Sequence, residues 1–517
     1  MPAYVPARMR GEPQVLPALG VALVAAALYV ATLAPGLMWG DDAELQRLAT
    51  VGNTRVDAHG HPMWFWIAML VARLPFGSIA WRVNLSSAIC GAFAVGLVFL
   101  VASRLTHRRG ASALAALAFA VSHTQWMHAV RAEVYALFMA MLAFTLLAFA
   151  EWRETRRPGL LFLMGLLAGA TLLSHMLIVT ALPGLVVGVW ASAAPGRRLH
   201  ALALFLGGWL AGLGLFLGRA GIEPVLHPMY GHGGPFSILS PPAGRDVVRW
   251  AAFTLYQFPL AAPLVAWGVR RTLRQDAALA WALLLVALGD VGFGLCFHVP
   301  DQYVFYMPAY LIAAIFLAFG VRSLREAWQR PGLRSAALVG ALVLAPPLVY
   351  RIAPMIAERA HFSLVSPRTL PGRDNDTYFM YPSKRGERSA DRFAREAFSV
   401  LPESALVVAD WAPLEPLRYL QEVEHERPDL SLEESRPAYP PQVDSLLELS
   451  HHRAVFIADD EPPPYYDIAA IRRRFVIRPT GPLFMLVPRH GPLPRVTPPP
   501  PQKTVARSPK PGPMRRG

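Results

Sequence analysis

Residues 82–104 read RVNLSSAICGAFAVGLVFLVASR, and this stretch decides the fold. No residue between its terminal arginines, Arg82 and Arg104, is charged. A helix needs roughly 20 predominantly apolar residues to cross a bilayer. The stretch therefore predicts a membrane-spanning helix with an arginine at each end.

Comparable apolar stretches recur on both sides of this one. Of the 517 residues only 16% are charged, whereas a soluble domain carries about a quarter. The deficit is concentrated between Val15 and Tyr350, which indicates an all-α polytopic membrane domain at residues 1–351. We expect about eleven spans, at approximately 16–35, 82–104, 110–123, 133–151, 159–173, 175–193, 199–218, 250–268, 277–297, 303–321 and 335–351.

The arginines between these spans predict the orientation. If the N-terminus, with Arg8 and Arg10, is cytoplasmic, every strongly basic short loop falls on the cytoplasmic side, as the positive-inside rule requires. The residue sets are Arg104, Arg108 and Arg109; Arg153, Arg156 and Arg157; Arg197 and Arg198; Arg270, Arg271 and Arg274; and Arg322, Arg325, Arg330 and Arg334. The C-terminal part then lies outside the cytoplasm, and the composition favours a bacterial inner membrane.

Two predicted outer loops are long. The loop at 36–81 contains an apolar, Trp-rich segment, Pro62 to Leu74, that favours an interfacial or re-entrant helix. The loop at 219–249 is rich in Gly, Pro and His. Loops of this length are usually functional or disordered.

The part after the spans has the composition of an aqueous domain. Residues 352–490 predict a small extracytoplasmic α/β domain, with a helix at 389–401, strands at 404–410 and 453–459, and a hairpin within 474–487. Both strands end in aspartate, which favours parallel pairing. The Pro-rich basic tail at 491–517 is expected to be disordered.

Charge and cysteine content exclude several functions. The net charge of +14 comes largely from loop arginines, so we expect no nucleic-acid partner. The two cysteines, Cys90 and Cys296, lie in apolar stretches and cannot form a disulfide framework. The outer histidines have no convincing ligand spacing. We therefore expect no cofactor; a divalent metal is conceivable, but nothing in the spacing supports it.

Three carboxylates follow the first span. Asp41, Asp42 and Glu44 come directly after Trp39, an interfacial anchor. Mutual repulsion and dehydration beside a membrane raise a carboxylate pKa and prepare a general base. A solvated acidic loop is an equally good explanation from charge alone.

Further polar residues lie at the same predicted face. Arg131, Glu133 and Tyr135 stand where an apolar span begins, and an ionisable residue at such a boundary indicates a functional site. A plain Arg131–Glu133 surface pair is the simpler alternative. Asp301 precedes another span and completes the set of outward acids.

Several short motifs resemble one family. They are Ala34–Glu44 (APGLMWGDDAE), His61-Pro62 followed by an aromatic helix, Arg82–Ala88 (RVNLSSA), Ala132–Leu137 (AEVYAL), Gly165–Pro183 with Ser174-His175, Phe305–Tyr310 (FYMPAY) and Leu417–Asp429 (LRYLQEVEHERPD). In this order they resemble bacterial membrane proteins of the GT-C glycosyltransferase superfamily, which are similar to the transmembrane protein O-mannosyltransferases. The resemblance runs from about residue 16 to 430.

The resemblance implies a GT-C-like fold and a polyprenyl-phosphate-linked sugar donor. The sugar would pass to a protein or glycolipid acceptor on the non-cytoplasmic face. Asp41 would be the general base and Glu44 the second acid. Asp42 and Ala43 depart from the Ser and Gly of the family pattern, so either aspartate could act. The implied substrate-binding residues are His61, Arg82, Arg131, Glu133, Tyr135, His175 and Asp301.

The chemistry of sugar transfer is consistent with the function that the resemblance implies, and two other classes of membrane protein stay open. An acceptor hydroxyl needs a base, and a lipid phosphate leaving group needs cations such as Arg82, Arg131 or Arg219. One base without a second nucleophilic carboxylate favours a single inverting displacement.

A lipid-linked-glycan transporter or flippase is one alternative. However, transporters place ionisable groups near the bilayer midplane, and here Asp290 is the main ionisable residue near the centre of a predicted span. A non-catalytic glycan-binding membrane scaffold is the other.

Overall fold

The structure is a computed structural model that describes residues 14–52, 61–220, 239–299, 301–328, 332–361, 369–436, 440–460, 465–492 and 497–498. Arg8, Arg10, Arg330, most of the loop after Arg219 and most of the tail lie outside these ranges. The chain divides into two compact units, Met1–Arg388 and Ser389–Gly517. This boundary differs from the predicted one at 351/352, because the segment before Arg388 packs into the first unit: the Lys384 amide donates to the Thr32 carbonyl at 2.9 Å.

The first unit is entirely helical where it is described, apart from an isolated bridge between Leu239 and Phe297. Its α-helices are α1 (Val15–Ala31), α2 (Asp41–Val51), α3 (Pro62–Ala72), α4 (Ile79–Thr106), α5 (Arg109–Ala120), α6 (His123–Ala129), α7 (Tyr135–Thr155), α8 (Gly159–Ala170), α9 (Ile178–Ser192), α10 (Arg198–Ala220), α12 (Gly244–Gln257), α13 (Ala262–Gln275), α14 (Ala277–Cys296), α15 (Met307–Ala327), α16 (Leu333–Leu344), α17 (Pro346–Arg359) and α18 (Asn375–Met380). Three 3-10 helices, η3 (Thr171–Leu173), η4 (Pro195–Arg197) and η5 (Gln302–Tyr306), extend or join them.

Every predicted span is helical, but not every one is a full-length straight helix. Five helices are long and apolar enough to cross a membrane: α4, α7, α10 with η4, α14, and α15 with η5. Two bent pairs, α12–α13 and α16–α17, could raise the total to seven. The stretches predicted at 16–35, 110–123, 159–173 and 175–193 form apolar helices of 10–17 residues.

The prediction of one span at 250–268 is wrong. Helix α12 ends at Gln257 and α13 begins at Ala262, and their axes differ by 98°. Pro259 explains the break, because proline removes a backbone donor and disfavours helical geometry at the preceding residue. That residue, Phe258, accordingly leaves the helical region at φ −134° and ψ 61°.

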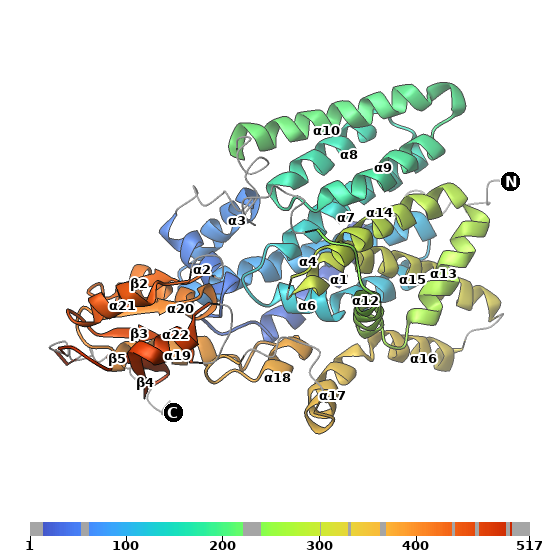
Figure 1. Ribbon diagram of the computed structural model, residues 1–517. Helices are drawn as coiled ribbons and strands as arrows, with labels where there is room; N and C mark the ends of the chain where they lie inside the picture. Colours follow the sequence, from blue (N-terminus) through green and yellow to red (C-terminus); the bar gives the residue numbers. More distant parts are fainter. Residues whose placement is uncertain are drawn as a thin grey trace, which may run out of the picture. The chain divides into compact units, whose positions relative to one another are not determined.

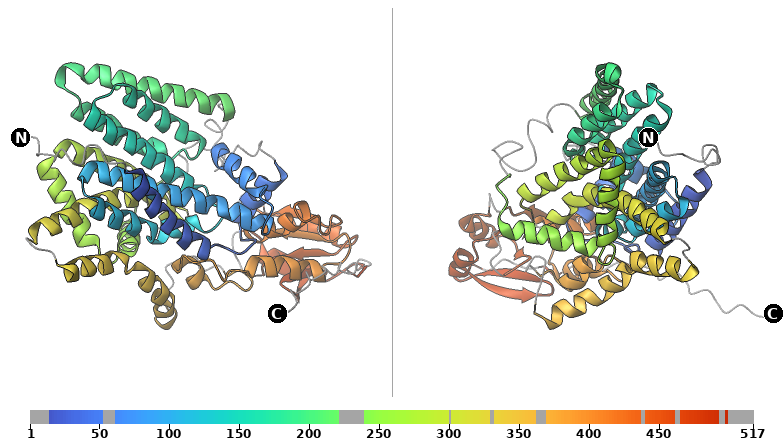
Figure 2. Two further views of the ribbon diagram at one scale, coloured as in Figure 1. Left: turned by 180° about the vertical axis from the view of Figure 1, so that it is seen from behind. Right: turned by 90° about the vertical axis from the view of Figure 1, so that its right-hand side faces the viewer.

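Helix α4 lies within the bundle and contacts α1, α3, α5, α6, α7 and α15. Helices α8, α9 and α10 lie together along one side of the unit (Figures 1 and 2). Glycines bring α8 and α10 close: a Cβ on Gly165 would lie 1.9 Å from the Phe205 carbonyl oxygen, and one on Gly208 would lie 2.0 Å from that of Phe162. Close backbone approach through small residues is how membrane helices associate in the absence of a hydrophobic driving force.

The arginine-bearing loops meet at one end of the helical unit, which we call the basic end. Arg104 pairs with Glu151 at 2.5 Å, and Arg153 pairs with Asp276 at 2.6 Å. Arg322 donates to the Thr106 carbonyl at 2.9 Å. These contacts join the ends of α4, α7 and α15 with the start of α14, so the grouping that the positive-inside rule predicts is also a spatial one.

The second unit contains a five-stranded sheet in the order β2-β1-β3-β5-β4. Its elements are α19 (Ser389–Val400), β1 (Leu406–Ala409), α20 (Trp411–Glu422), β2 (Ser431–Glu434), α21 (Val443–Ser450), β3 (Val455–Ile457), α22 (Ile468–Arg474), β4 (Phe475–Thr480) and β5 (Leu483–Pro488). The predicted helix, the parallel β1–β3 pair and the β4–β5 hairpin are confirmed. The edge strand β2 was missed because its sequence, SLEE, lacks the apolar character of a core strand.

Candidate active site

A glycine turn sets the direction of the first acidic residues. Gly40 has φ 58° and ψ −128°, a conformation open essentially to glycine alone, and α2 begins at the next residue. Asp41, Asp42 and Glu44 form the first turn of α2. The positive end of a helix dipole favours negative charge at this position. The loop and helix therefore hold three carboxyls in a fixed arrangement.

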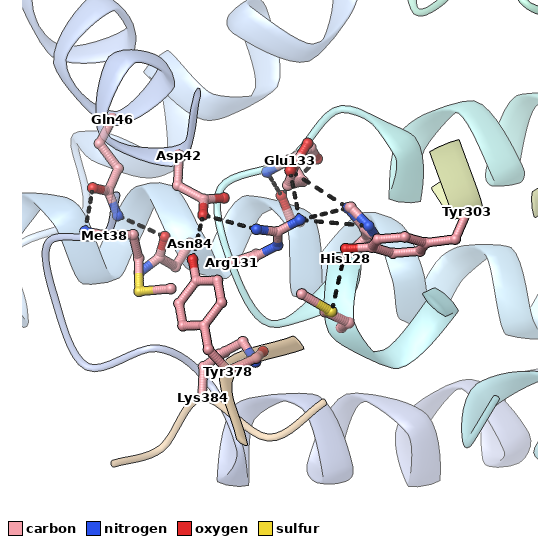
Figure 3. Close-up of polar contacts among 12 residues, drawn as sticks. Met38, Asp42, Gln46, Asn84, His128, Arg131, Glu133, Tyr303, Tyr378 and Lys384 are labelled. Carbon is pink, nitrogen blue, oxygen red and sulfur yellow. Dashed lines mark hydrogen bonds and ion pairs between the residues drawn. The ribbon is translucent and has the colours of Figure 1, made fainter. Parts of the chain in front are cut away.

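Neighbouring Asp41 and Asp42 occupy different environments. Asp42 is 1% exposed, and its Oδ2 accepts from Arg131 Nη1 at 3.1 Å and from the Tyr378 hydroxyl at 3.5 Å (Figure 3). The Asp41 side chain is exposed, and within the described chain it makes no hydrogen bond or ion pair. The structure thus separates the two aspartates by environment: Asp41 is accessible, and Asp42 is engaged by Arg131 and Tyr378.

Arg131 is held between two carboxylates. Its Nη2 lies 2.9 Å from Glu133 Oε1, opposite its contact with Asp42 (Figure 3). His128 also reaches Glu133, with Nδ1 at 3.5 Å from Oε1. The backbone around this group is fixed as well, because the Ser87 hydroxyl donates to the Glu133 carbonyl at 2.9 Å. The simple surface pair considered from sequence is therefore replaced by a buried, bridged network.

Loss of water around the carboxyls is the main reason that the pKa values of these acids are raised. Displacement of water by the surrounding protein raises the pKa of Asp41 well above its usual range, and the charges of Glu133 and Asp301 add to the effect. Burial raises the pKa of Asp42 to about 7 against the opposing influence of Arg131. Burial, and then Glu133, raise the pKa of Asp301 to about 6. A general base at neutral pH needs a pKa shifted in this direction.

Lys384 and Tyr378 are site residues that the sequence interpretation missed. The Lys384 side chain is 2% exposed and donates to the Tyr381 carbonyl at 2.9 Å and to that of Tyr378. Burial, and then the charge of Arg131, lower its pKa to about 7. One signal was available: the chain has only three lysines, at 384, 503 and 510, against 46 arginines.

His61, Tyr135 and His175 form an aromatic group next to this network. The His61 ring is 5.1 Å from that of His175, which is 5.1 Å from Tyr135. Tyr135 in turn lies 5.1 Å from His128. His61 Nδ1 also contacts the Ser174 carbonyl at 2.6 Å. The ends of α3, η3 and α7, distant in sequence, therefore converge beside Glu133.

Arg82, Glu44 and Asp301 are the remaining residues that the sequence predicted for this site. Arg82 donates to the Leu74 carbonyl, and its Nε has no hydrogen-bond partner among the described residues. Glu44 has further contacts and shares the first turn of α2. Asp301 joins the acidic group through its electrostatic interaction with Glu133 and Arg131.

Among the residues that the structure describes, no three His, Cys, Asp or Glu side chains are placed to hold a metal ion.

Part of this chain is similar to a known family of glycosyltransferases. Residues 56–195 match the family model described as the protein O-mannosyl-transferase TMEM260 N-terminal domain. The chain is 36% identical over 132 residues to protein O-mannosyl-transferase TMEM260 of Mus musculus, which is 24% of this chain and 18% of that protein. The match to the mouse protein thus spans under a fifth of that protein's length. The segment that fits the family model contains Arg82, Arg131, Glu133 and His175.

The fold has relatives among solved structures. ArnT from Cupriavidus metallidurans in the apo state superposes with a TM-score of 0.54 at 15% sequence identity, covering 90% of this chain and 97% of that chain. The structure of ArnT from Cupriavidus metallidurans bound to undecaprenyl phosphate superposes with a TM-score of 0.51 at 15% sequence identity, and it too covers 90% of this chain and 97% of that chain. The chain is therefore a multi-pass membrane protein with a GT-C-type fold, similar to O-mannosyltransferases.

Proposed function

We propose that this protein is a membrane glycosyltransferase that moves a sugar from a polyprenyl-phosphate donor to a protein or glycolipid acceptor, with Asp41 as the general base. One observation carries the proposal most directly: Asp41 is an accessible carboxyl without a partner among the described residues, next to the buried Asp42–Arg131–Glu133 network. The O-mannosyltransferase-like segment and the GT-C-type fold support the same chemistry.

The different environments of the two aspartates support different roles for them. A base must meet the acceptor hydroxyl at hydrogen-bond distance, which the exposed Asp41 side chain permits. Asp42 Oδ2 accepts hydrogen bonds from Arg131 and Tyr378, and these bonds hold the first turn of α2 in place. Asp42 is therefore a positioning residue.

The reaction is a single displacement at the anomeric carbon. The acceptor oxygen forms a bond to this carbon while Asp41 takes the hydroxyl proton. The bond from the carbon to the phosphate oxygen breaks, and the lipid phosphate leaves with the electron pair. The configuration inverts because there is one displacement.

The leaving phosphate requires a cation outside the bridged network. The charge of Arg131 is already compensated by Asp42 and Glu133. Arg82, at the start of α4, and Arg219, whose guanidinium lies over the Trp66 ring at 5.8 Å, are better placed for a new anion. Guanidinium binds phosphate through paired hydrogen bonds. His61, Tyr135, His175 and Asp301 would then contact the sugar or the acceptor.

We further propose that the protein lies in a bacterial inner membrane with the acidic residues on the non-cytoplasmic side. The basic end carries the loop arginines, and cytoplasmic loops are enriched in arginine. Helix α2, which begins at Asp41, lies at the other end of the helical unit (Figure 1). Donor and acceptor would thus meet outside the cytoplasm.

Mass spectrometry of surface glycans and glycoproteins in a deletion strain tests this function. We expect one class of glycosylated product to disappear on deletion and to return with the wild-type gene or with the control Glu154→Gln, an acid at the basic end. It should not return with Asp41→Asn protein present at equal abundance. Restoration by Asp41→Asn would contradict the assignment of the base. Accumulation of an unmodified lipid-linked glycan on the inner face would indicate a transporter instead.

A further inference from the structure

Helix α13 has one face packed and one face open. Gly268 faces α15 so closely that a Cβ there would lie 1.9 Å from the Phe316 carbonyl oxygen. Gly320 of α15 makes the reciprocal approach, 2.0 Å from the Leu264 carbonyl oxygen. The opposite face carries the exposed side chains of Ala266, Trp267, Arg270 and Arg274.

Two hollows flank the arginines of this open face. The first is an open groove of about 630 Å³ whose walls are mainly apolar, lined by Ala266, Val269, Arg270, Leu273 and Arg274. The second, of about 390 Å³, is lined by Trp267, Arg270, Arg271, Arg274 and Gln275. Arg270 and Arg274 border both hollows, because residues four apart lie on one face of a helix.

The charge of these two arginines is uncompensated. Neither forms a hydrogen bond or ion pair with any residue that the structure describes. The neighbouring acids are engaged elsewhere: Glu326 binds Arg271 at 2.6 Å and Arg322 at 2.8 Å, and Asp276 binds Arg153 at 2.6 Å. The groove therefore combines two free guanidinium groups with an apolar wall.

This combination fits one class of ligand. A guanidinium presents paired donors that match a phosphate, and tryptophan is enriched at the membrane–water interface. Basic sites at the cytoplasmic ends of membrane helices bind anionic lipid head groups. We propose that Arg270 and Arg274 bind the phosphate of an anionic membrane phospholipid whose acyl chain lies against Ala266, Val269 and Leu273.

This site is separate from the one around Asp41, because α13 and α2 lie toward opposite ends of the helical unit (Figures 1 and 2). It holds whether or not the transferase proposal does. Its ligand would be a structural lipid, one that anchors the bent α12–α13 pair at the basic end.

Native mass spectrometry of the full-length protein tests the proposal. Detergent-purified protein would be titrated with dioleoylphosphatidylglycerol and, separately, with dioleoylphosphatidylcholine. We expect retention of phosphatidylglycerol only, and about tenfold or greater weakening in Arg270→Gln/Arg274→Gln, since each charge-assisted hydrogen bond counts for about a factor of ten or more. The control Arg157→Gln/Arg334→Gln removes two exposed arginines, one in the loop after α7 and one in α16, and should bind as the wild type does. Because all four side chains are exposed, both double variants should fold.

Several results would overturn the proposal. Equal weakening in both double variants would mean general attraction by net charge. Unchanged binding in Arg270→Gln/Arg274→Gln would place the lipid elsewhere. Displacement of the lipid by millimolar inorganic phosphate would make the site one for a free anion, and preferential retention of undecaprenyl phosphate would make it a donor-lipid site. The variant Arg270→Lys/Arg274→Lys keeps both positive charges but loses the paired guanidinium donors. It should bind phosphatidylglycerol more weakly than the wild type and more strongly than Arg270→Gln/Arg274→Gln.

Discussion

Asp41 and Asp42 are adjacent in the sequence, but the structure gives them different partners. Asp42 turns toward Arg131 at 3.1 Å, and Asp41 turns toward solvent. The charge of Glu133 contributes to raising the pKa of Asp41. The proposed base must be deprotonated to act, so the rate should rise with pH through this raised pKa.

A pH–rate profile checks this electrostatic relation. In Glu133→Gln one negative charge beside Asp41 is removed, so the pKa of Asp41 should fall and the rising limb of kcat/KM should move to lower pH. Glu154→Gln, distant from the site, should leave the limb where it is. A limb that stays in place in Glu133→Gln, or moves to higher pH, would show that Asp41 is not the group whose titration the profile reports.

Lys384 should make folding stability depend on pH. Burial lowers its pKa in the folded protein to about 7, whereas an unfolded chain has a lysine pKa of about 10.4. The unfolded state therefore binds more protons between these values, so this contribution to stability rises from pH 7 to pH 10. At about 1.4 kcal/mol per pKa unit the full difference is on the order of a few kcal/mol.

Thermal unfolding of wild type and Lys384→Met in detergent measures this contribution. The Tm of the wild type relative to the variant should increase as the pH rises from 7 to 10. Subtracting the two curves removes the titration of the other groups. A difference that is constant with pH would mean that Lys384 keeps an ordinary pKa in the folded state.

At the scale of elements, glycine contacts hold α8 against α10. A Cβ on Gly208 would meet the Phe162 carbonyl oxygen at 2.0 Å, whereas a Cβ on the adjacent Gly207 would meet nothing within 4 Å. Gly208→Ala should therefore push the helices apart and destabilise the protein by about 1–3 kcal/mol, as overpacking does. Gly207→Ala should be neutral or slightly stabilising, since alanine favours a helix by about 1 kcal/mol over glycine. Equal Tm values for the two variants would show that α8 and α10 do not approach so closely.

The sequence predicted the helices and strands better than it predicted the tertiary contacts between side chains. The length of each apolar stretch predicted the positions of α4, α7, α10, α14 and α15, because apolar character along a helix is a local property of the sequence. It failed at 250–268, where the effect of Pro259 outweighed the apolar composition. The ion pair between Asp42 and Arg131 could not be predicted, because it joins residues 89 positions apart through tertiary packing.

Lys384 illustrates the same limit more strongly. Its surroundings in sequence, YPSKRGE, look like an ordinary exposed turn. Only the fold brings this turn beneath the end of α1, where the Thr32 carbonyl accepts from its amide. The resemblance to known motifs supplied Asp41, Arg131 and Glu133 as candidates, but only the structure shows that Asp41 is exposed and Asp42 is buried.

At the scale of the whole molecule, sidedness is the property on which donor access depends. Cysteines would be introduced singly at Ser240 and Arg157 after Cys90 and Cys296 are replaced by alanine. A membrane-impermeant maleimide added to intact cells should label position 240, whose hydroxyl contacts His298 at 2.9 Å, three positions before Asp301. It should label position 157, at the basic end, only after permeabilisation. The reverse pattern would place the acidic residues in the cytoplasm and contradict the proposed orientation.

The most direct test of the central claim is sugar transfer by the purified full-length protein in liposomes. The donor would be polyprenyl-phosphate-linked mannose with a labelled sugar, and the acceptors would be envelope proteins and glycolipids extracted from the deletion strain. We expect label in a new glycosidic bond with the wild type and with Glu154→Gln. With Asp41→Asn the rate should be about 10²- to 10⁴-fold lower, with unchanged retention of undecaprenyl phosphate. Transfer by Asp41→Asn at the wild-type rate, or movement of the intact donor across the bilayer without bond formation, would contradict the proposed function.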